Sequence, residues 1–250
     1  MTYMLADEIK KHLKDDIDIT VFETLDSTNS EMKRRTADIK NYSVIIAKHQ
    51  SGGRGRHGKS FFSPENSGLY MSMYFAADSI ENVLEITSKA AVAVSRAIER
   101  VALKKVGIKW VNDLYIDGKK VCGILAEGVW KDENPVGVIL GVGINCYKTD
   151  FPEELRNIAG SVADNINEVS FAHLTAEVIS ELIKCDKLPF SKMADEYRKK
   201  SFLLGKRIYV VGEACEYTAL DIDENGGLVV LDDLGEKRVI TSGEVSVRLK

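Results

Sequence analysis

The segment 50–59 (QSGGRGRHGK) contains the residues best suited to bind an anion. Its glycines, at positions 52, 53, 55 and 58, let the backbone approach a ligand closely and adopt positive φ. Arg54, Arg56 and Lys59 lie beside them and supply strong donors for anionic oxygens. The segment therefore favours a polyphosphate or a phosphoanhydride ligand. A flexible basic surface loop is the alternative that composition alone leaves open.

Residues 53–60 (GRGRHGKS) also match the phosphate-loop pattern G-x-x-x-x-G-K-[ST]. In that motif a helix begins directly after the lysine. Here the segment 61–64 (FFSP) follows, and its proline and bulky residues are not expected to open a helix. We therefore expect the match to be coincidental.

A second group of reactive side chains lies at 109–113 (KWVND). An apolar strand there delivers a lysine, an amide and a carboxylate close together. A lysine in this position can neutralise charge that develops on a phosphate or carboxylate oxygen. The alternative is that Lys109 and Asp113 form an exposed ion pair beside a core tryptophan.

Three further segments have compositions that suit a binding site. At 26–29 (DSTN), Thr28 with Glu31 fits a capping box that opens a helix, and the free N–H groups of the same helix start suit an acceptor group. At 123–127 (GILAE) and 141–145 (GVGIN), glycines interrupt predicted strands. Such glycines indicate close approach of a ligand, or else a bulge or a tight crossing within the sheet.

The elements that must position these groups follow from the spacing of apolar residues. Strands are predicted at 19–23, 43–47, 69–75, 106–110 and 136–144, with a β-hairpin at 114–125 that turns at Asp117-Gly118. Helices are predicted at 28–38, 81–105, 170–185 and 192–201. From about residue 205, short strands alternate with tight turns. The pattern predicts an α+β protein, with a mixed-sheet domain flanked by helices over 1–203 and a small β-barrel over 204–250.

Composition narrows the classes of protein to consider. The 250 residues carry a formal net charge of −4, which disfavours a protein that mainly coats nucleic acid. No apolar run suggests a membrane span, and the polar start does not resemble a signal peptide, so we expect a cytoplasmic protein. The four cysteines form no CxxC pair and do not cluster with histidines, which argues against zinc and against a disulfide framework.

The order of these motifs is more specific than any one of them. D-S-T-N, Q-x-x-G-R-G-R-x-G-K, K-W-x-N-D-L, G-I-L-x-E and G-x-G-I-N together resemble the biotin protein ligase family from about residue 19 to 145, and 243–248 resembles its closing strand. The resemblance implies a class II synthetase-like catalytic domain and an SH3-like C-terminal barrel. It also implies a monofunctional type, since no segment is left for an N-terminal helix-turn-helix.

The activity implied by this resemblance has two steps. Biotin's carboxylate attacks the α-phosphate of ATP, with Mg²⁺, to give biotinyl-5′-AMP and pyrophosphate. The adenylate then acylates one lysine of a biotin carboxyl carrier protein domain, as in acetyl-CoA carboxylase. The C-terminal barrel would help to close the nucleotide site or to dock the carrier. DNA and membranes are not expected partners, and a homodimer is left open.

The resemblance also assigns roles by position, with Lys109 and Arg54 as catalytic residues. The residues that it places at biotin or biotinyl-AMP are Ser27, Thr28, Asn29, Gln50, Gly53, Arg54, Gly55, Arg56, Lys109, Gly123 and Leu125. Those that it places on the nucleotide side are Phe61, Asn112, Asn145 and Arg248. It implies no metal site in the protein beyond the Mg²⁺ that is bound with ATP.

Two positions depart from the family pattern. Val111 replaces a common proline, which we expect to loosen the strand end but to leave Lys109 and Asn112 in place. His57 replaces an arginine of some members, so one loop charge becomes pH-dependent.

Three alternatives to a biotin ligase are a lipoate or octanoate ligase, a nucleic-acid-binding module with a basic loop, and a non-catalytic protein that retains the fold.

Overall fold

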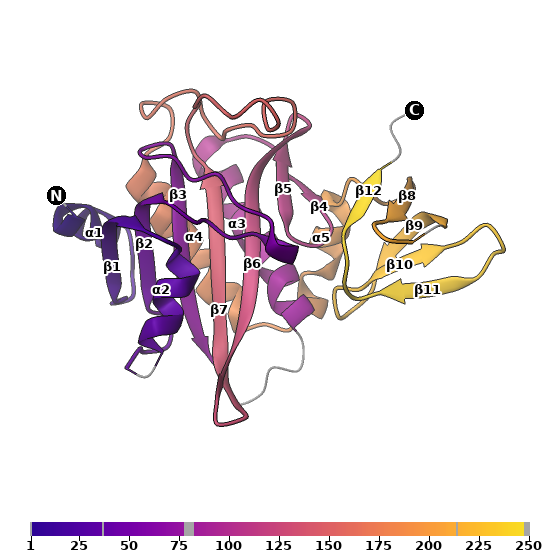
Figure 1. Cartoon of the computed structure of the whole chain (residues 1–250), viewed down its shortest axis with the longest axis horizontal. Coiled ribbons are helices and arrows are strands. Elements are labelled where there is room, and N and C mark those ends of the chain that lie inside the picture. Colours follow the sequence, from indigo (N-terminus) through magenta and orange to yellow (C-terminus); the bar gives the residue numbers. More distant parts are fainter. Residues whose placement is uncertain (1, 37, 78–82, 214, 248–250) are drawn as a thin grey trace.

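The computed structural model describes residues 2–36, 38–77, 83–213 and 215–247. These residues form a seven-stranded sheet with helices on both faces and a separate five-stranded sheet. Figure 1 shows that the smaller sheet projects from the end of the body that carries β4 (Gly107–Lys109), and that the N-terminus lies at the opposite end. The α+β class and the mixed-sheet main body are therefore as predicted.

The large sheet explains how distant motifs meet. Its strand order is β1 (Ile19–Leu25), β2 (Val44–Gln50), β3 (Gly68–Ala76), β7 (Asn134–Asn145), β6 (Lys119–Lys131), β5 (Asp113–Ile116) and β4. Within this sheet, β1 and β2 pair in parallel, and every other pair of neighbouring strands is antiparallel. In the β5–β6 hairpin, Asp117 and Gly118 have φ values of 48° and 74°, which confirms the predicted type I′ turn.

Helices cover the two faces of this sheet unequally. α3 (Val83–Ala102), α4 (Phe171–Asp186) and α5 (Ala194–Lys200) lie behind it in Figure 1, and α2 (Thr28–Arg35) lies in front. The buried stripe of α3 includes Ala90, Ala91, Val94 and Ile98, at helical spacing. The four predicted helices are confirmed, with ends that differ by a few residues. Short 3₁₀ turns occur at Arg56–Gly58 and Phe190–Lys192.

One helix was not predicted. α1 (Thr2–Lys10) packs beside β1 and α4, where Ile9 is fully buried. The segment is only nine residues long, which is too short for its apolar residues to set a clear helical period. A helix of this length is marginal without the surface against which it packs.

The smaller sheet is antiparallel throughout. Its order is β11 (Lys237–Ile240), β10 (Leu228–Leu231), β9 (Glu216–Ile222), β8 (Arg207–Val210) and β12 (Val245–Val247). Buried apolar residues such as Ile208 and Leu228 form its interior and join the core of the main body. Closure of this sheet into a barrel, and the boundary at residue 203, stay predictions.

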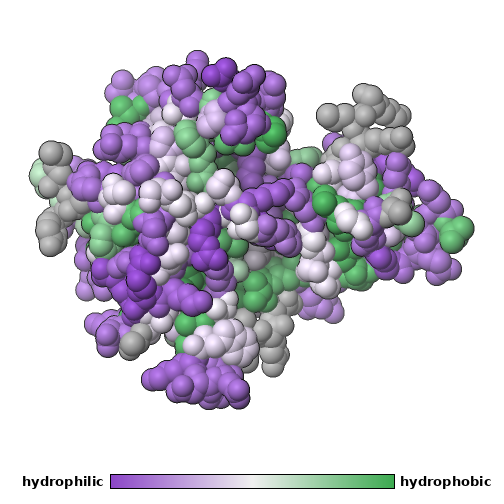
Figure 2. Space-filling model, viewed as in Figure 1, coloured by the Kyte–Doolittle hydropathy of each residue, from purple (hydrophilic) through white to green (hydrophobic). Residues whose placement is uncertain are grey.

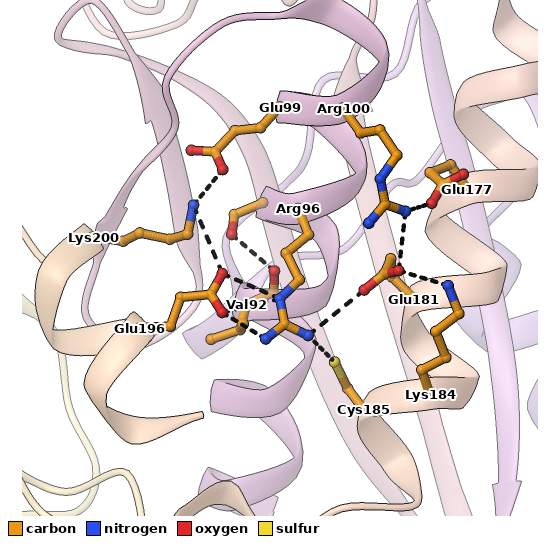
Figure 3. A network of polar contacts seen from close by, with 11 residues as sticks. Val92, Arg96, Glu99, Arg100, Glu177, Glu181, Lys184, Cys185, Glu196 and Lys200 are labelled. Carbon is orange, nitrogen blue, oxygen red and sulfur yellow. Dashed lines mark hydrogen bonds and ion pairs between the residues drawn. The ribbon is translucent and has the colours of Figure 1, made fainter. Parts of the chain in front are cut away.

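An ion-pair network holds the helices behind the sheet together (Figure 3). Arg96 of α3 lies 2.5 Å from Glu196 of α5 and 3.6 Å from Glu181 of α4. Arg100 and Lys184 also contact Glu181. Burial opposes the ionisation of Glu181, but these three cations outweigh that effect and lower its pKa from 4.5.

The face of the molecule in Figure 2 is mainly polar. Figure 2 shows hydrophilic side chains over much of the face that carries α2, with smaller hydrophobic patches between them. Among the helices of the described residues, none combines the length and the apolar character that crossing a bilayer requires.

The Glu181 network gives a stability prediction. Glu181→Ala removes the buried carboxylate that Arg96, Arg100 and Lys184 share, although Arg96 keeps Glu196 and Arg100 keeps Glu177. It should destabilise the protein by about 1–2 kcal/mol in denaturant unfolding. The folded-state pKa is lowered, so the carboxylate contributes stability above pH 4.5 and loses it as the pH falls through the folded value. The gap between wild type and variant should therefore narrow in acid. Asp195→Asn, at an exposed pair with Arg198, is the control and should cost less than about 0.5 kcal/mol.

Candidate active site

A cleft of about 390 Å³ opens where the β2–β3 loop crosses in front of β6 and β7 (Figure 1). All five sequence motifs contribute to its wall. The predicted site residues that line it are Ser27, Thr28, Asn29, Gln50, Arg54, Gly55, Arg56, Phe61, Lys109, Asn112, Gly123 and Leu125. The structure thus brings together groups separated by nearly 100 positions in the chain, such as Asn29 and Leu125.

Among the described residues, two predicted site residues stand apart from this wall. Gly53 packs beneath the loop, where a Cβ atom would overlap the Phe61 carbonyl. Asn145 is buried, and its amide donates to the Gly160 carbonyl oxygen at 3.0 Å, so it supports the segment that follows β7. Arg248 lies outside the described residues. The roles given to Asn145 and Arg248 stay predictions.

The start of α2 does not form the predicted capping box. Ser27 is the N-cap residue, without a side-chain capping bond, and Glu31 instead pairs with Arg34 and Arg35. Thr28 donates its backbone N–H to Gln50 Oε1 at 2.8 Å. The capping prediction is wrong because tertiary partners recruit these groups, which leaves Thr28 and Asn29 almost completely buried.

A buried hydrogen-bond chain forms one end of the cleft. Ser72 Oγ of β3 lies 2.8 Å from Thr28 Oγ1 and 2.5 Å from Asn29 Oδ1. Asn29 Nδ2 donates to Glu127 Oε2 at 2.7 Å. On the other side, Gln50 Nε2 donates to Ser63 Oγ at 2.9 Å. Polar groups fixed in this way can read donors and acceptors on a ligand.

The strand glycines make room for side chains from the opposite wall. A Cβ atom at Gly141 would overlap Asn29 Oδ1, and one at Gly143 would lie 2.6 Å from the Phe61 ring. Gly123 also faces this ring, at 3.3 Å. Phe61 in turn packs edge-on against Tyr70, with ring centroids 6.3 Å apart. The glycines therefore admit Asn29 and Phe61 to the cleft, a use that the sequence did not distinguish from ligand approach.

The other end of the cleft is basic and meets the C-terminal sheet. Arg56 donates to Asn112 Oδ1 and to the Gly243 carbonyl oxygen, each at 3.2 Å. Lys59 Nζ pairs with Glu244 at 2.6 Å. Burial lowers the pKa of Arg56, an effect opposed by the charges of Asp113 and Glu244. Segment 243–245 therefore forms part of the cleft wall, and the C-terminal sheet helps to close it.

The strand end that carries Lys109 is firmly held. Val111 is buried, its carbonyl oxygen accepts from the Tyr197 hydroxyl at 3.2 Å, and the Trp110–Val111 peptide bond is cis. Trp110 Nε1 donates to the Gly226 carbonyl oxygen of the C-terminal sheet at 2.8 Å. The expected loosening at Val111 stays a prediction, whereas Lys109 and Asn112 both line the cleft.

Lys59, Lys109 and Lys120 all line the cleft, and Lys120 is the one that was not predicted from the sequence. Lys109 makes no hydrogen bond or ion pair within the described part of the chain, and burial lowers its pKa against the opposing charges of Asp113 and Glu244. Lys120 pairs with Asp113 Oδ1 at 2.7 Å. Its Nζ lies 3.5 Å from the Cβ position of Gly123, next to the Phe61 ring.

A bulge explains why Lys120 was missed. Strict alternation along β6 would put Lys120 and Gly123 on opposite faces. The β5–β6 register shifts between Leu114 and Tyr115, and both Val121 and Cys122 are buried, so Lys120 turns to the cleft side. Two consecutive apolar residues within an otherwise alternating strand were the available signal.

No protein metal centre accompanies these groups among the described residues, where no cluster of His, Cys, Asp and Glu side chains could hold an ion. The four cysteines are free, three of them buried. The cleft presents hydrogen-bonding side chains at one end and lysine and arginine cations at the other.

Comparison with known proteins identifies the family. Residues 21–145 match the biotin/lipoate A/B protein ligase family, and residues 203–248 match the biotin protein ligase C-terminal domain. The chain is 32% identical over 216 residues to the bifunctional ligase/repressor BirA of Bacillus subtilis, covering 80% of this chain and 64% of that protein. It therefore spans less than two thirds of the length of that relative.

Two further comparisons cover a larger share of the matched protein. The biotin–[acetyl-CoA-carboxylase] ligase of Mycobacterium tuberculosis is 32% identical over 236 residues, covering 88% of this chain and 85% of that protein. The structure of the Aquifex aeolicus biotin protein ligase in complex with biotin and ATP has a TM-score of 0.78 and 28% identity, covering 93% and 99% of the two chains. The chain thus belongs to the biotin/lipoate A/B protein ligase family and carries the biotin protein ligase C-terminal domain.

Proposed function

We propose that this chain is an ATP-dependent biotin protein ligase. It would activate biotin as biotinyl-5′-AMP and transfer biotin to a lysine of a biotin carboxyl carrier protein domain, as in acetyl-CoA carboxylase. One observation carries the proposal: a single cleft has a fixed polar end and a cationic end. The polar end contains Thr28, Asn29 and Gln50, and the cationic end contains Arg56, Lys109 and Lys120.

The polar end favours biotin over lipoate or octanoate. A ureido ring offers one carbonyl acceptor and two N–H donors, which suit the side chains of Asn29, Gln50 and Thr28. A dithiolane ring or a hydrocarbon tail offers no strong donor or acceptor and would leave the remaining hydrogen-bonding capacity of these groups unused. Such a mismatch is costly in a site built from hydrogen bonds.

The cationic end suits the attack of one anion on another. When the carboxylate oxygen bonds to the α-phosphorus and pyrophosphate leaves, Lys109, Lys120 and Arg56 would offset the repulsion and the developing charge. Lys120 is placed beside Gly123, on the strand where the acid's tail would run toward the phosphate. Mg²⁺ would enter with ATP, held by its phosphates.

The second step needs a protected anhydride and a neutral amine. The carrier's lysine ε-amine would attack the acyl carbon, the acyl–oxygen bond would break, and AMP would leave. Until then, the loop over the cleft would exclude water from the adenylate. Arg56 is anchored to Asn112 and to the Gly243 carbonyl oxygen, so it would hold the loop on the nucleotide side.

The expected macromolecular partner is this carrier domain rather than DNA. A net charge of −4 disfavours a protein that mainly coats a duplex. We place the reaction in the cytoplasm, where ATP and the carrier would be available. A homodimer stays a prediction.

Acid specificity is the first test of the function. With ATP and Mg²⁺, biotin should give biotinyl-AMP by mass spectrometry, whereas lipoate and octanoate should give at least about a hundredfold less adenylate. Thermal stability should rise with biotin and rise further when ATP is added. Equal adenylation of octanoate would instead support the lipoate-type alternative.

Biotin-dependent pyrophosphate exchange tests the roles of Lys109 and Lys120 one at a time. Lys109→Ala and Lys120→Ala should each lower the exchange rate by about 10²–10³-fold, because each removes a cation aimed at developing charge. Lys131→Ala, at the exposed tip of the β6–β7 hairpin, is the matched control and should change little. If one variant keeps the wild-type rate, that lysine is not catalytic.

Arg56 can be tested through the fate of the intermediate. Arg56→Gly removes the hydrogen bonds of this side chain to Asn112 and to the Gly243 carbonyl oxygen. Biotinyl-AMP should then leave the cleft and label lysines of added bystander proteins. The measurement is adenylate release after gel filtration, together with labelling of a protein without a carrier domain. Unchanged retention would exclude Arg56 as the residue that holds the loop.

A further inference from the structure

Glu127 occupies the point where the loop and the polar end of the cleft meet. It lies on β6, and its side chain is about one third exposed, at 31%. Glu127 Oε1 pairs with Arg54 Nη2 at 3.0 Å, and Glu127 Oε2 accepts from Asn29 Nδ2 at 2.7 Å. One carboxylate therefore connects the loop to the group expected to read the ligand's ring.

The orientation of the Asn29 amide depends on this carboxylate. Asn29 Oδ1 lies 2.5 Å from Ser72 Oγ and against Gly141, so its acceptor end is fixed. The donor end has Glu127 as its close partner, with the Leu125 carbonyl oxygen farther away at 3.5 Å. A hydrogen bond to a charged acceptor is roughly twice as strong as a neutral one, so Glu127 dominates this contact.

Arg54 depends on Glu127 even more. Its side chain is half exposed, and Glu127 is the partner of its guanidinium within the described part of the chain. Arg56, two residues on, is anchored instead to Asn112 and Gly243 at the other end of the cleft. The two arginines thus fasten the loop at opposite ends, and the anchor at the acid end is a single ion pair.

We propose that Glu127 is a positioning residue that couples the acid pocket to the loop through Arg54 and Asn29. It keeps Arg54 over the acid end of the cleft, with its remaining N–H groups free to donate to the acyl-adenylate. The hold of the loop on the intermediate then depends on the residues that bind the acid. This inference rests on the proposed function and adds a residue whose role is neither binding nor chemistry.

Two substitutions separate the two contacts. Glu127→Gln keeps a carbonyl acceptor for Asn29 but removes the ion pair. It should raise the rate of biotinyl-AMP release about fivefold, as expected for a partly exposed pair, with the KM for biotin within about twofold of wild type. Glu127→Ala removes both contacts and should also raise the KM for biotin about tenfold. The KM for ATP should stay near wild type in both.

A double-mutant cycle tests whether Glu127 acts through Arg54. If it does, Arg54→Met with Glu127→Gln should release the adenylate no faster than Arg54→Met alone. Multiplied effects of the two substitutions, or wild-type retention by Glu127→Gln, would overturn the coupling. A merely structural role would lower thermal stability and shift both KM values together, which would also count against it.

Glu23→Gln is the matched control. Glu23 pairs with Lys48 at 3.0 Å on neighbouring strands β1 and β2, away from the cleft, so its loss should leave adenylate release unchanged. If the wild-type chain forms no adenylate, the proposed function fails, and this inference fails with it. If the adenylate forms and Glu127→Gln retains it normally, only the coupling is wrong.

Discussion

Several positive charges lie close together in one small cleft, and the fold has to offset their mutual repulsion. Arg56, Lys59, Lys109 and Lys120 repel one another, and burial further penalises Arg56 and Lys109. Two carboxylates make the arrangement tolerable, because Asp113 pairs with Lys120 and Glu244 pairs with Lys59. Neither carboxylate cancels the charge on Lys109, which stays available to an anion. The carboxylates therefore help to place the cations and leave part of their charge for a ligand.

The two faces of the large sheet differ in how their charges are paired. The back face carries α3, α4 and α5, whose own charges are neutralised in pairs within the Glu181 network (Figure 3). The front face keeps its cations incompletely paired and covers them with a loop. The packed helices behind the sheet thus support a site in front of it whose cations are not all paired. Glu127 lies on the front face and combines both features, because its carboxylate pairs with Arg54 and also accepts a hydrogen bond from Asn29 in the cleft.

Local sequence signals were sufficient to predict the segments that build the cleft. The hairpin turn at Asp117-Gly118 has a short pattern with one physical meaning, whereas the glycine-arginine loop and the strand end at Lys109 each had an alternative without a binding role. The order of the motifs added the family. Sequence reasoning was weakest where a residue's neighbours come from elsewhere in the chain. Thr28 has the composition of a helix cap, yet Gln50 and Ser72 engage it. Lys120 faces the cleft only because a bulge reverses the alternation of β6.

The contacts between the C-terminal sheet and the cleft have a thermodynamic consequence. The Gly226 carbonyl oxygen holds Trp110, and the Gly243 carbonyl oxygen holds Arg56, so the strand end and the loop share one support. Two equilibria that share contacts are reciprocally linked. If docking of the C-terminal sheet strengthens binding of an adenylate by some factor, a bound adenylate must strengthen that docking by the same factor. The small sheet would thus be held most firmly when the cleft is full, and its attachment would report on what the cleft contains.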